Sequence, residues 1–248
     1  MADPMVTVAR PRRTARKGGL SSVVAYETSD RLFASTGVQY DADHCMPVVG
    51  EVQLCYTPDV AAAAKEGEGT SWANGIGVNF AGYIGVECFL HEGSTAEFED
   101  RARRGFEAKQ DRFVEGQLWL WLVGATGLAA ATSVVAAIGK LEEDADQKYV
   151  GAPILHMSRE DADAAAAAGV LVTQAGSGQL FTANGNPVVA SSAYASGTIA
   201  ISGDLTPVQS ELMVRSDIAH TTNREVAIAE RAFNVVVDCD YREKITFA

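Results

Sequence analysis

The sequence predicts an α+β protein, and three observations lead to this fold class. β-Prone runs occupy residues 48–56 and 76–90, an amphipathic helical pattern extends over 95–122, and alternating apolar residues return between 226 and 247. The chain has 248 residues, of which 47% are hydrophobic and 21% are charged. This composition is that of a folded globular protein long enough to bury a sizeable core.

The first 17 residues differ in charge from the rest of the chain. They carry five basic side chains and one acid, so a total of −12 leaves −16 on the other 231 residues. A body this acidic repels phosphate, and we do not expect its folded part to bind nucleic acid in the ordinary way. The basic segment lacks apolar periodicity, which is typical of a mobile, solvated terminus; the alternative is an arm that contacts a partner or an enclosed polyanion. It also lacks the apolar region of a secretory signal.

A long β-hairpin is predicted after this arm. Residues 48–56 form its clearest strand, 76–90 form the second, and a largely polar stretch at 57–75 joins them. A loop this long usually contacts a partner. Gly75 and Gly77 resemble the start of a dinucleotide-binding motif, but the next glycine is Gly82 and no helix follows, so a turn entering the strand is the better interpretation.

The best-signalled helix extends from about residue 95 to 122, roughly 40 Å at 1.5 Å per residue. Ser94 and Glu97 form a capping-box pattern at its start. Apolar residues recurring at spacings of 4, 4, 7 and 7 predict a buried stripe of Phe98, Ala102, Phe106, Phe113 and Leu120. Three i,i+4 pairs place the acid first, which is the favourable order: Glu97–Arg101, Glu99–Arg103 and Asp100–Arg104.

Residues 116–139 contain no charged residue and satisfy the length criterion for a membrane span. Gly124 and Gly127 interrupt this stretch, its second half is rich in Ala, Thr and Ser, and its flanks lack a basic bias. We therefore expect two helices instead, with the second over about 127–147. The buried face of that second helix is predicted to contain Ala131, Val134, Val135, Ile138 and Leu141.

The rest of the chain alternates short strands and turns. A strand at 153–157 leads to Ser158, which can cap a third helix that reaches Ala168 and stops at Gly169. β-Prone runs follow at 170–173, 178–183 and 187–190, with Asn184-Gly185 as a tight-turn signal. Residues 196–221 are interpreted as turn-rich, and 226–247 as a long strand pair.

No catalytic, cofactor-binding or metal-binding residue is predicted, and we expect a protein that is not an enzyme. The histidines have no second ligand at metal spacing, and His44 and Cys45 are neighbours whose side chains would point to opposite strand faces. No C-x-x-C motif occurs, so reduced thiols are expected. The residues concerned are His44, His91, His156, His220, Cys45, Cys55, Cys88 and Cys239.

Two further groups have a structural and a chemical interpretation. Asp238 and Asp240 would share one strand face, either as a carboxylate pair for acid–base chemistry or, as we favour, as a solvated face next to Arg242. Trp119 and Trp121 would form either an aromatic platform for nucleic acid or, as we favour, part of the core or of a subunit interface. Neither group indicates an active site.

The order of these elements resembles the tailed-phage major capsid fold, the Johnson fold that encapsulins share. Four stretches are similar to capsid proteins of phages of actinobacteria. Residues 101–119, ending in Leu118-Trp119, resemble the spine helix, and 153–158 with the alanine-rich helix after it resemble the peripheral-domain strand and helix. Residues 180–189 resemble the strand that enters the axial domain, and 222–240 resemble the closing strands. The resemblance covers residues 45–248.

This resemblance implies a domain plan. Residues 1–44 would be an N-terminal arm, 45–92 the extended loop, 93–170 with 222–248 the peripheral domain, and 171–221 the axial domain. Copies of the chain would assemble into hexamers and pentamers that form an icosahedral shell around double-stranded DNA. The type member of the fold cross-links its subunits through a Lys–Asn isopeptide; Lys65 lies in the corresponding region, but no partner or catalytic acid matches, so this activity is not carried over.

The resemblance also implies partners and a location. A portal and a separate scaffolding protein would contact the shell, DNA would be enclosed without sequence-specific binding, and no membrane would be involved. The chain would be assembled in the cytoplasm of the bacterial host and reside in the virion. Two alternatives stay open: an encapsulin-type shell that encloses protein cargo, and an enzyme with an unrecognised site in the axial region.

Overall fold

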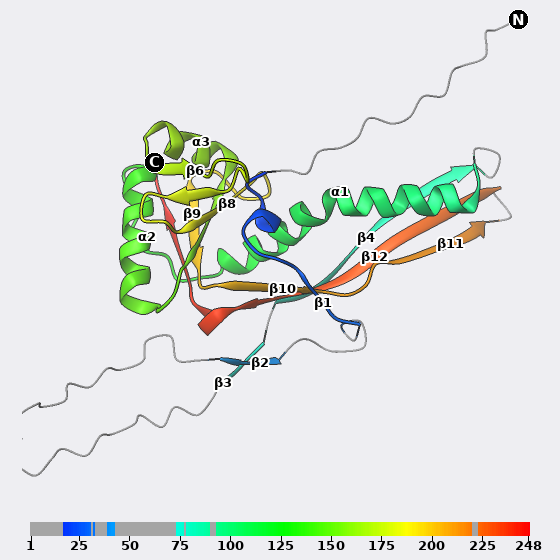
Figure 1. The fold of residues 1–248 in the computed structure, drawn as a ribbon, viewed down its shortest axis with the longest axis horizontal. Coiled ribbons are helices and arrows are strands. Elements are labelled where there is room, and N and C mark those ends of the chain that lie inside the picture. The colour runs from blue at the N-terminus through cyan, green and yellow to red at the C-terminus, as the bar shows by residue number, and fades with distance from the viewer. Residues whose placement is uncertain are drawn as a thin grey trace, which may run out of the picture.

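The computed structural model confirms an α+β fold made of two lobes (Figure 1). The structure describes residues 17–30, 32, 39–42, 73–76, 78–89, 93–219 and 223–248. The elongated lobe contains helix α1 (Thr95–Leu122) and strands β1 (Glu27–Thr28), β4 (Val78–Phe89), β10 (Leu205–Gln209), β11 (Met213–Ala219) and β12 (Arg224–Val237). The compact lobe contains α2 (Val134–Lys148), α3 (Arg159–Ala167), β5 (Ile154–Ser158), β6 (Leu171–Thr173), β7 (Leu180–Thr182), β8 (Pro187–Ser191), β9 (Thr198–Ser202) and β13 (Arg242–Thr246).

Strand β12 lies at the centre of the elongated lobe's sheet. It pairs antiparallel with β4 along one edge, from Arg224 opposite Phe89 to Val235 opposite Val78. Along its other edge it pairs antiparallel with β11 and then with β10, and β1 adds to β10 in parallel. Because both edges of β12 are hydrogen-bonded, this strand joins every other strand of the sheet, directly or through β10.

Helix α1 lies along one face of this sheet (Figure 1), with the bounds that the sequence predicted. The capping box is present: the Glu97 amide donates to Ser94 Oγ at 3.4 Å, and the Ser94 amide donates to Glu97 Oε2 at 2.8 Å. That second bond lowers the pKa of the exposed Glu97 carboxyl. Asp100 pairs with Arg104 as predicted, whereas the Glu99 carboxylate accepts a hydrogen bond from Ser216 Oγ at 2.8 Å.

The buried side of α1 turns around the helix along its length. Phe98 and Phe106 are buried as predicted, but the later buried positions are Leu118 and Leu122. Each step of four residues overshoots one turn by about 40°, so a line of such steps winds around the helix. Leu120 was predicted on the stripe and is 66% exposed, because the buried side has moved away from it by that point.

An aromatic cluster holds α1 on the sheet. The ring of Phe233 on β12 lies 5.6 Å from that of Phe80, 6.3 Å from that of Phe106 and 6.2 Å from that of Phe113. Gly82 on β4 permits this approach, since a Cβ there would lie 2.5 Å from the Phe113 ring. Aromatic contacts of this kind add to the hydrophobic stabilisation of a core.

The compact lobe is built on a six-stranded sheet with the order β13-β9-β5-β8-β7-β6. Strand β5 is buried along its whole length, parallel to β8 and antiparallel to β9. Helix α3 follows as predicted: Ser158 Oγ accepts the Asp161 amide at 3.0 Å, and Gly169 has a left-handed φ of 77° beyond its end. The predicted turn at Asn184-Gly185 connects β7 to β8, with φ of 91° at Gly185.

Helix α2 begins at Val134, so the predicted start near residue 127 is wrong. Ser133 is its N-cap and accepts the Ala136 amide at 3.2 Å. The residues before it run alongside β13 instead, where Gly127 bridges to Lys244. Val135 was predicted on the buried face and is 41% exposed; Ala137 takes a buried place in that face.

Two predictions for the last third of the chain are also wrong. Residues 196–221 contain the strands β9, β10 and β11, because their turn-forming residues fall in short connections between apolar runs. The C-terminal strands do not pair with each other: β12 belongs to the elongated lobe, and β13 pairs with β9. The chain switches sheets at the turn Asp238–Asp240 (η4), where Cys239 and Asp240 have φ of 57° and 54°.

The predicted domain plan lies partly outside the described residues. The strand at 48–56 and the stretch 57–72 are not described; β3 (Ala73–Ile76) pairs with β2 (Gln39–Ala42), and β4 pairs with β12. The division into 93–170 with 222–248 and 171–221 stays a prediction. Strand pairing crosses it, since β5 pairs with β8 and β9 in one sheet.

Candidate functional site

The sheet of the elongated lobe has one face that α1 does not cover. Side chains alternate along a strand, so on β4 the partly buried Ile84 and Val86 point toward α1, and Tyr83 and Glu87 point away from it. The registers place the same alternation on β11 and β12. We call the uncovered side the outer sheet face; it consists of Tyr83, Gly85, Glu87, Phe89, Met213, Arg215, Asp217, Arg224, Val226, Ile228 and Glu230.

The outer sheet face mixes large apolar side chains with charges. Tyr83 is 74% exposed, Phe89 is 41% exposed and Ile228 is 38% exposed. The guanidinium of Arg224 binds Glu87 at 2.9 Å and lies 4.9 Å from the centre of the Phe89 ring. Contiguous exposed apolar groups rimmed by charges are typical of a surface that contacts another protein.

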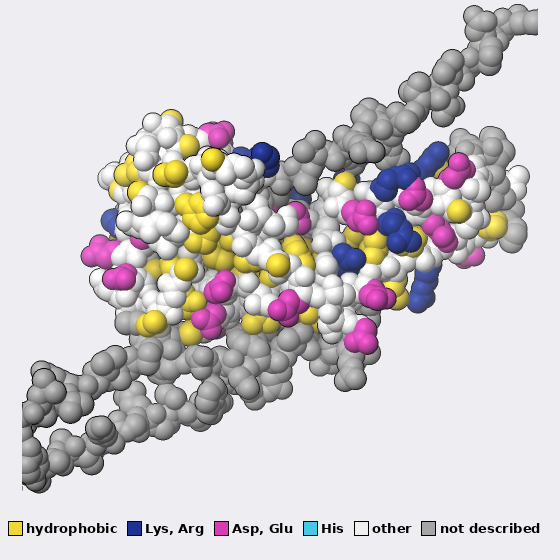
Figure 2. All heavy atoms as spheres, in the orientation of Figure 1, with side chains coloured by type: hydrophobic (Ala, Val, Ile, Leu, Met, Phe, Trp, Pro, Cys, Tyr) yellow, Lys and Arg dark blue, Asp and Glu magenta, His cyan; other side chains and the backbone are white. Residues whose placement is uncertain are grey.

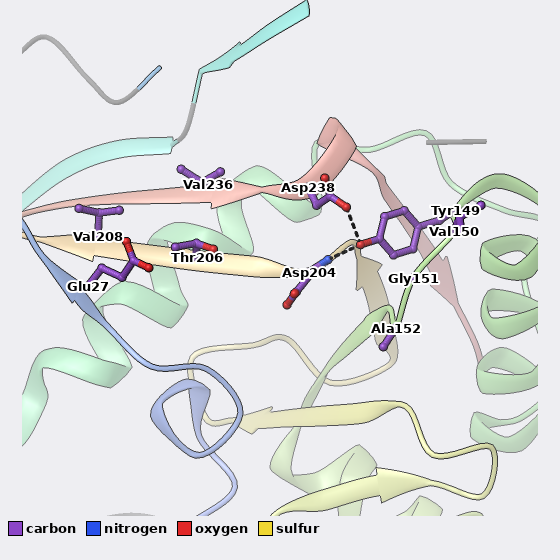
Figure 3. Close-up of a pocket in the computed structure, with 10 residues that line it drawn as sticks. All are labelled: Glu27, Tyr149, Val150, Gly151, Ala152, Asp204, Thr206, Val208, Val236 and Asp238. Carbon is purple, nitrogen blue, oxygen red and sulfur yellow. Dashed lines mark hydrogen bonds between the residues drawn. The ribbon is translucent and has the colours of Figure 1, made fainter. Parts of the chain in front are cut away.

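A second candidate is a cleft of about 600 Å³ where the two lobes join. The Tyr149 hydroxyl donates to Asp238 Oδ2 at 2.8 Å and accepts from the Asp204 amide at 3.0 Å (Figure 3). Burial raises the pKa of Tyr149, so its hydroxyl stays protonated. Its lining is acidic and apolar, without histidine, cysteine, lysine or arginine: Glu27, Tyr149, Val150, Gly151, Ala152, Asp204, Thr206, Val208, Val236 and Asp238.

This cleft is a joint between chain segments. The Tyr149 hydroxyl connects the β9–β10 crossing, at Asp204, with the β12–β13 crossing, at Asp238, and the Asp238 amide also donates to the Asp204 carbonyl at 2.9 Å. The predicted shared strand face of Asp238 and Asp240 is wrong, because both lie in the turn η4 and Asp240 is exposed. Since its one buried hydroxyl is committed to these bonds, the cleft offers no activated nucleophile.

The predicted structural histidine is found within the compact lobe. His156 is fully buried, with ring nitrogens 3.3 Å from Tyr194 Oη and 3.0 Å from Ser202 Oγ. Burial lowers its pKa to about 3, so the ring is neutral at ordinary pH. His44, His91 and His220 lie outside the described residues. Among the residues that the structure describes, no group of histidine, cysteine and acidic side chains could hold a metal ion.

The tryptophans belong to the core and to the lobe junction. Trp119 is 7% exposed and stacks on Tyr194 at 4.7 Å, whereas the Trp121 ring lies 4.0 Å beneath the Arg242 guanidinium. Arg242 also donates to the Trp121 carbonyl at 2.8 Å, and Lys244 donates to the Val123 carbonyl, so β13 caps the C-terminus of α1. No helix in the described part of the chain is long and apolar enough to cross a bilayer.

The sequence gave no warning of two buried or half-buried glutamates. Glu115 is fully buried on α1, where it accepts the Leu20 amide at 2.8 Å and the Ser191 hydroxyl, and so fastens the N-terminal segment to both lobes. Glu142 on α2 accepts three hydrogen bonds from the β7–β8 turn. Each lacks a partner nearby in sequence; the only signal was Glu115 adjoining an uncharged stretch.

The chain is similar over nearly its whole length to solved phage and particle structures. It matches the capsid of a native GTA particle with a TM-score of 0.57 and 12% identity, over 100% of this chain and 95% of that one. A chain of Mycobacterium phage Che8 gives 0.54 and 11%, over 98% and 97%. A chain of Mycobacterium phage Adephagia gives 0.54 and 13%, over 97% and 95%. The sequence matches no protein-family model and no curated protein.

At identities this low, the likeness establishes the fold. The protein has the phage capsid fold, as the order of its elements predicted. Both lobes take part in the match, since it spans the chain from end to end.

Proposed function

We propose that this chain is the major capsid protein of a tailed bacteriophage. Copies of it would assemble into hexamers and pentamers that form an icosahedral shell around the double-stranded DNA genome. The observation that carries the proposal is the end-to-end match to the capsid of a GTA particle, which includes both the elongated and the compact lobe. The main partner is then the chain itself.

The outer sheet face supports this role. Its exposed Tyr83 and Ile228 leave apolar area in water that a second copy would bury. Its charges include both signs, Arg215 and Arg224 beside Glu87, Asp217 and Glu230, so opposite charges can meet across a contact between copies. A shell repeats each contact many times, and its stability therefore does not require any single contact to be strong.

The same proposal accounts for the lack of catalytic chemistry in the described residues. A shell subunit needs surfaces and not an activated nucleophile, and the polar groups at the lobe junction serve to connect chain segments. We further propose that a portal and a separate scaffolding protein contact the shell, and that DNA is enclosed without sequence-specific binding. Assembly would take place in the cytoplasm of the bacterial host, and the mature location would be the virion.

Particle formation tests the proposal. The purified wild-type chain should form closed shells visible by negative-stain electron microscopy. Tyr83→Asp should fold, with an unchanged circular dichroism spectrum, but should stay unassembled because it places a charge in the contact. Tyr83→Phe is the matched control and should assemble. Phe106→Asp should also prevent assembly, by placing a charge in the buried stripe of α1.

The outcomes separate the possible errors. A wild-type chain that stays monomeric at every concentration and salt would contradict the capsid function. Normal shells from Tyr83→Asp would contradict the outer sheet face as a contact while leaving the function intact. Particles that contain protein cargo in place of nuclease-protected DNA would favour the encapsulin-type alternative.

A further inference from the structure

The turn between β7 and β8 carries a chemically labile pair. Asn184-Gly185 is one of two Asn-Gly pairs in the chain, the other being Asn74-Gly75. In such pairs the backbone nitrogen of the glycine can attack the side-chain amide carbon of the asparagine, because glycine has no side chain to obstruct the approach. Asparagine is among the thermolabile residues for this reason.

The reaction needs only water. A bond forms between Gly185 N and Asn184 Cγ, the bond from Cγ to Nδ2 breaks, and the proton of the glycine amide leaves with Nδ2 as ammonia. Water then opens the cyclic imide, and the product is aspartate or isoaspartate at position 184. Asn184 is exposed, so water reaches it freely.

Glu142 on α2 holds this turn through its carboxylate. Its Oε2 accepts a hydrogen bond from Asn184 Nδ2 at 2.8 Å, and its Oε1 accepts from Asn186 Nδ2 at 2.8 Å and from Thr182 Oγ1 at 2.5 Å. The Gly185 amide donates to the Thr182 carbonyl at 3.0 Å. Both reacting groups are therefore engaged: the attacking nitrogen by Thr182 and the leaving nitrogen by Glu142.

These bonds oppose the reaction. The glycine nitrogen must give up its hydrogen bond and turn toward Cγ, and the asparagine side chain must rotate away from a charged acceptor. Hydrogen bonds to charged groups are among the stronger ones, so their loss adds to the barrier. An Asn-Gly pair without such a carboxylate has no equivalent restraint on its side chain.

We propose that Asn184-Gly185 is a latent deamidation site that the Glu142 carboxylate keeps closed in the folded chain. Deamidation would replace the Asn184 amide with a carboxylate facing Glu142, so an attraction would become a repulsion. The β7–β8 turn would then separate from α2. The proposal is independent of the capsid function.

Peptide mass spectrometry of aged protein tests it. The wild-type chain, Glu142→Ala and Glu143→Ala should be incubated at mildly alkaline pH, with circular dichroism to confirm folding, alongside wild-type chain in urea. Glu142→Ala should deamidate at Asn184 about tenfold faster than the folded wild type, as the loss of one such hydrogen bond predicts. Glu143→Ala, which removes an exposed glutamate from the same helix, should match the wild type. The Asn74 peptide should age equally in all three folded proteins.

Two results would overturn the proposal. One is equal deamidation at Asn184 in folded wild type and folded Glu142→Ala; the other is a folded wild type that reacts as fast as the chain in urea. Should Glu142→Ala fail to fold, Asn184→Asp gives a second measurement. It should lower the Tm in the wild-type background and lower it less in Glu142→Gln, whose amide can donate to the new carboxylate. Equal losses of Tm in both backgrounds would contradict the pairing.

Discussion

The two lobes bury their sheets to different degrees. In the compact lobe, β5 is buried at all five positions. In the elongated lobe, the first half of β12 alternates: Ala227 and Ala229 are fully buried toward α1, while Ile228 between them is 38% exposed. The compact lobe therefore completes its own core, whereas the elongated lobe completes one face of its sheet and leaves the other to solvent or to a partner.

The strongest expected effect falls on the one core of the elongated lobe. Phe233→Ala should lower the free energy of unfolding by about 3–5 kcal/mol, because it leaves a cavity among the rings of Phe80, Phe106 and Phe113. Urea unfolding measures the loss. Hydrogen exchange should quicken in β4 and β12 more than in β5 and β8; equal quickening would mean that the lobes unfold as one unit.

Acid should act on the compact lobe through His156. Its pKa is about 3 in the folded chain and near 6.5 when unfolded, so the unfolded chain binds the extra proton first. Stability from this residue is complete above pH 6.5 and falls as the pH drops toward 3, by up to about 1.4 kcal/mol per pH unit. Urea unfolding as a function of pH measures the slope, and His156→Gln should reduce it. An unchanged slope in that variant would assign the acid sensitivity to other groups.

A smaller effect is expected where the N-terminal segment joins both lobes. Glu115→Ala would leave the Leu20 amide and the Ser191 hydroxyl without their acceptor and should cost about 1–3 kcal/mol. Limited trypsin digestion should cleave after Lys17 faster in this variant. Glu107→Ala, an exposed position on the same helix, is the control and should cleave at the wild-type rate.

The smallest effect is expected on the outer sheet face. Ile228→Ser should change the free energy of unfolding of the monomer by no more than about 0.5 kcal/mol, since the side chain is exposed. Chemical denaturation of unassembled protein measures this. A loss comparable to that of Phe233→Ala would show that the face is buried within one chain, and the contrast between the lobes would disappear.

Local signals predicted local structure well. The bounds of α1 followed from Ser94 and Glu97, and those of α3 from Ser158 and Gly169, because a cap depends on residues within one turn of it. The order of elements was enough to predict the capsid fold. The exposed Leu120 and the separate sheets of β12 and β13 could not be predicted, since both depend on which surface packs against which.

The candidate surface was even less accessible to sequence reasoning. The alternation of β12 predicted two faces, but which face α1 covers depends on contacts between residues more than one hundred positions apart. Glu115 and Glu142 were missed for the same reason, as their hydrogen-bond partners lie 40 or more positions away.

The chain passes between the lobes three times, after α1, between β9 and β10, and between β12 and β13. A body attached at one point can swivel freely, whereas attachment at two separate points leaves a single axis of rotation and a third can remove even that. The lobes thus have at most one internal degree of freedom, and Tyr149 and Arg242 resist it. In a shell of the proposed kind, where identical subunits occupy five-fold and six-fold positions, we expect curvature to be adjusted between copies and not inside them.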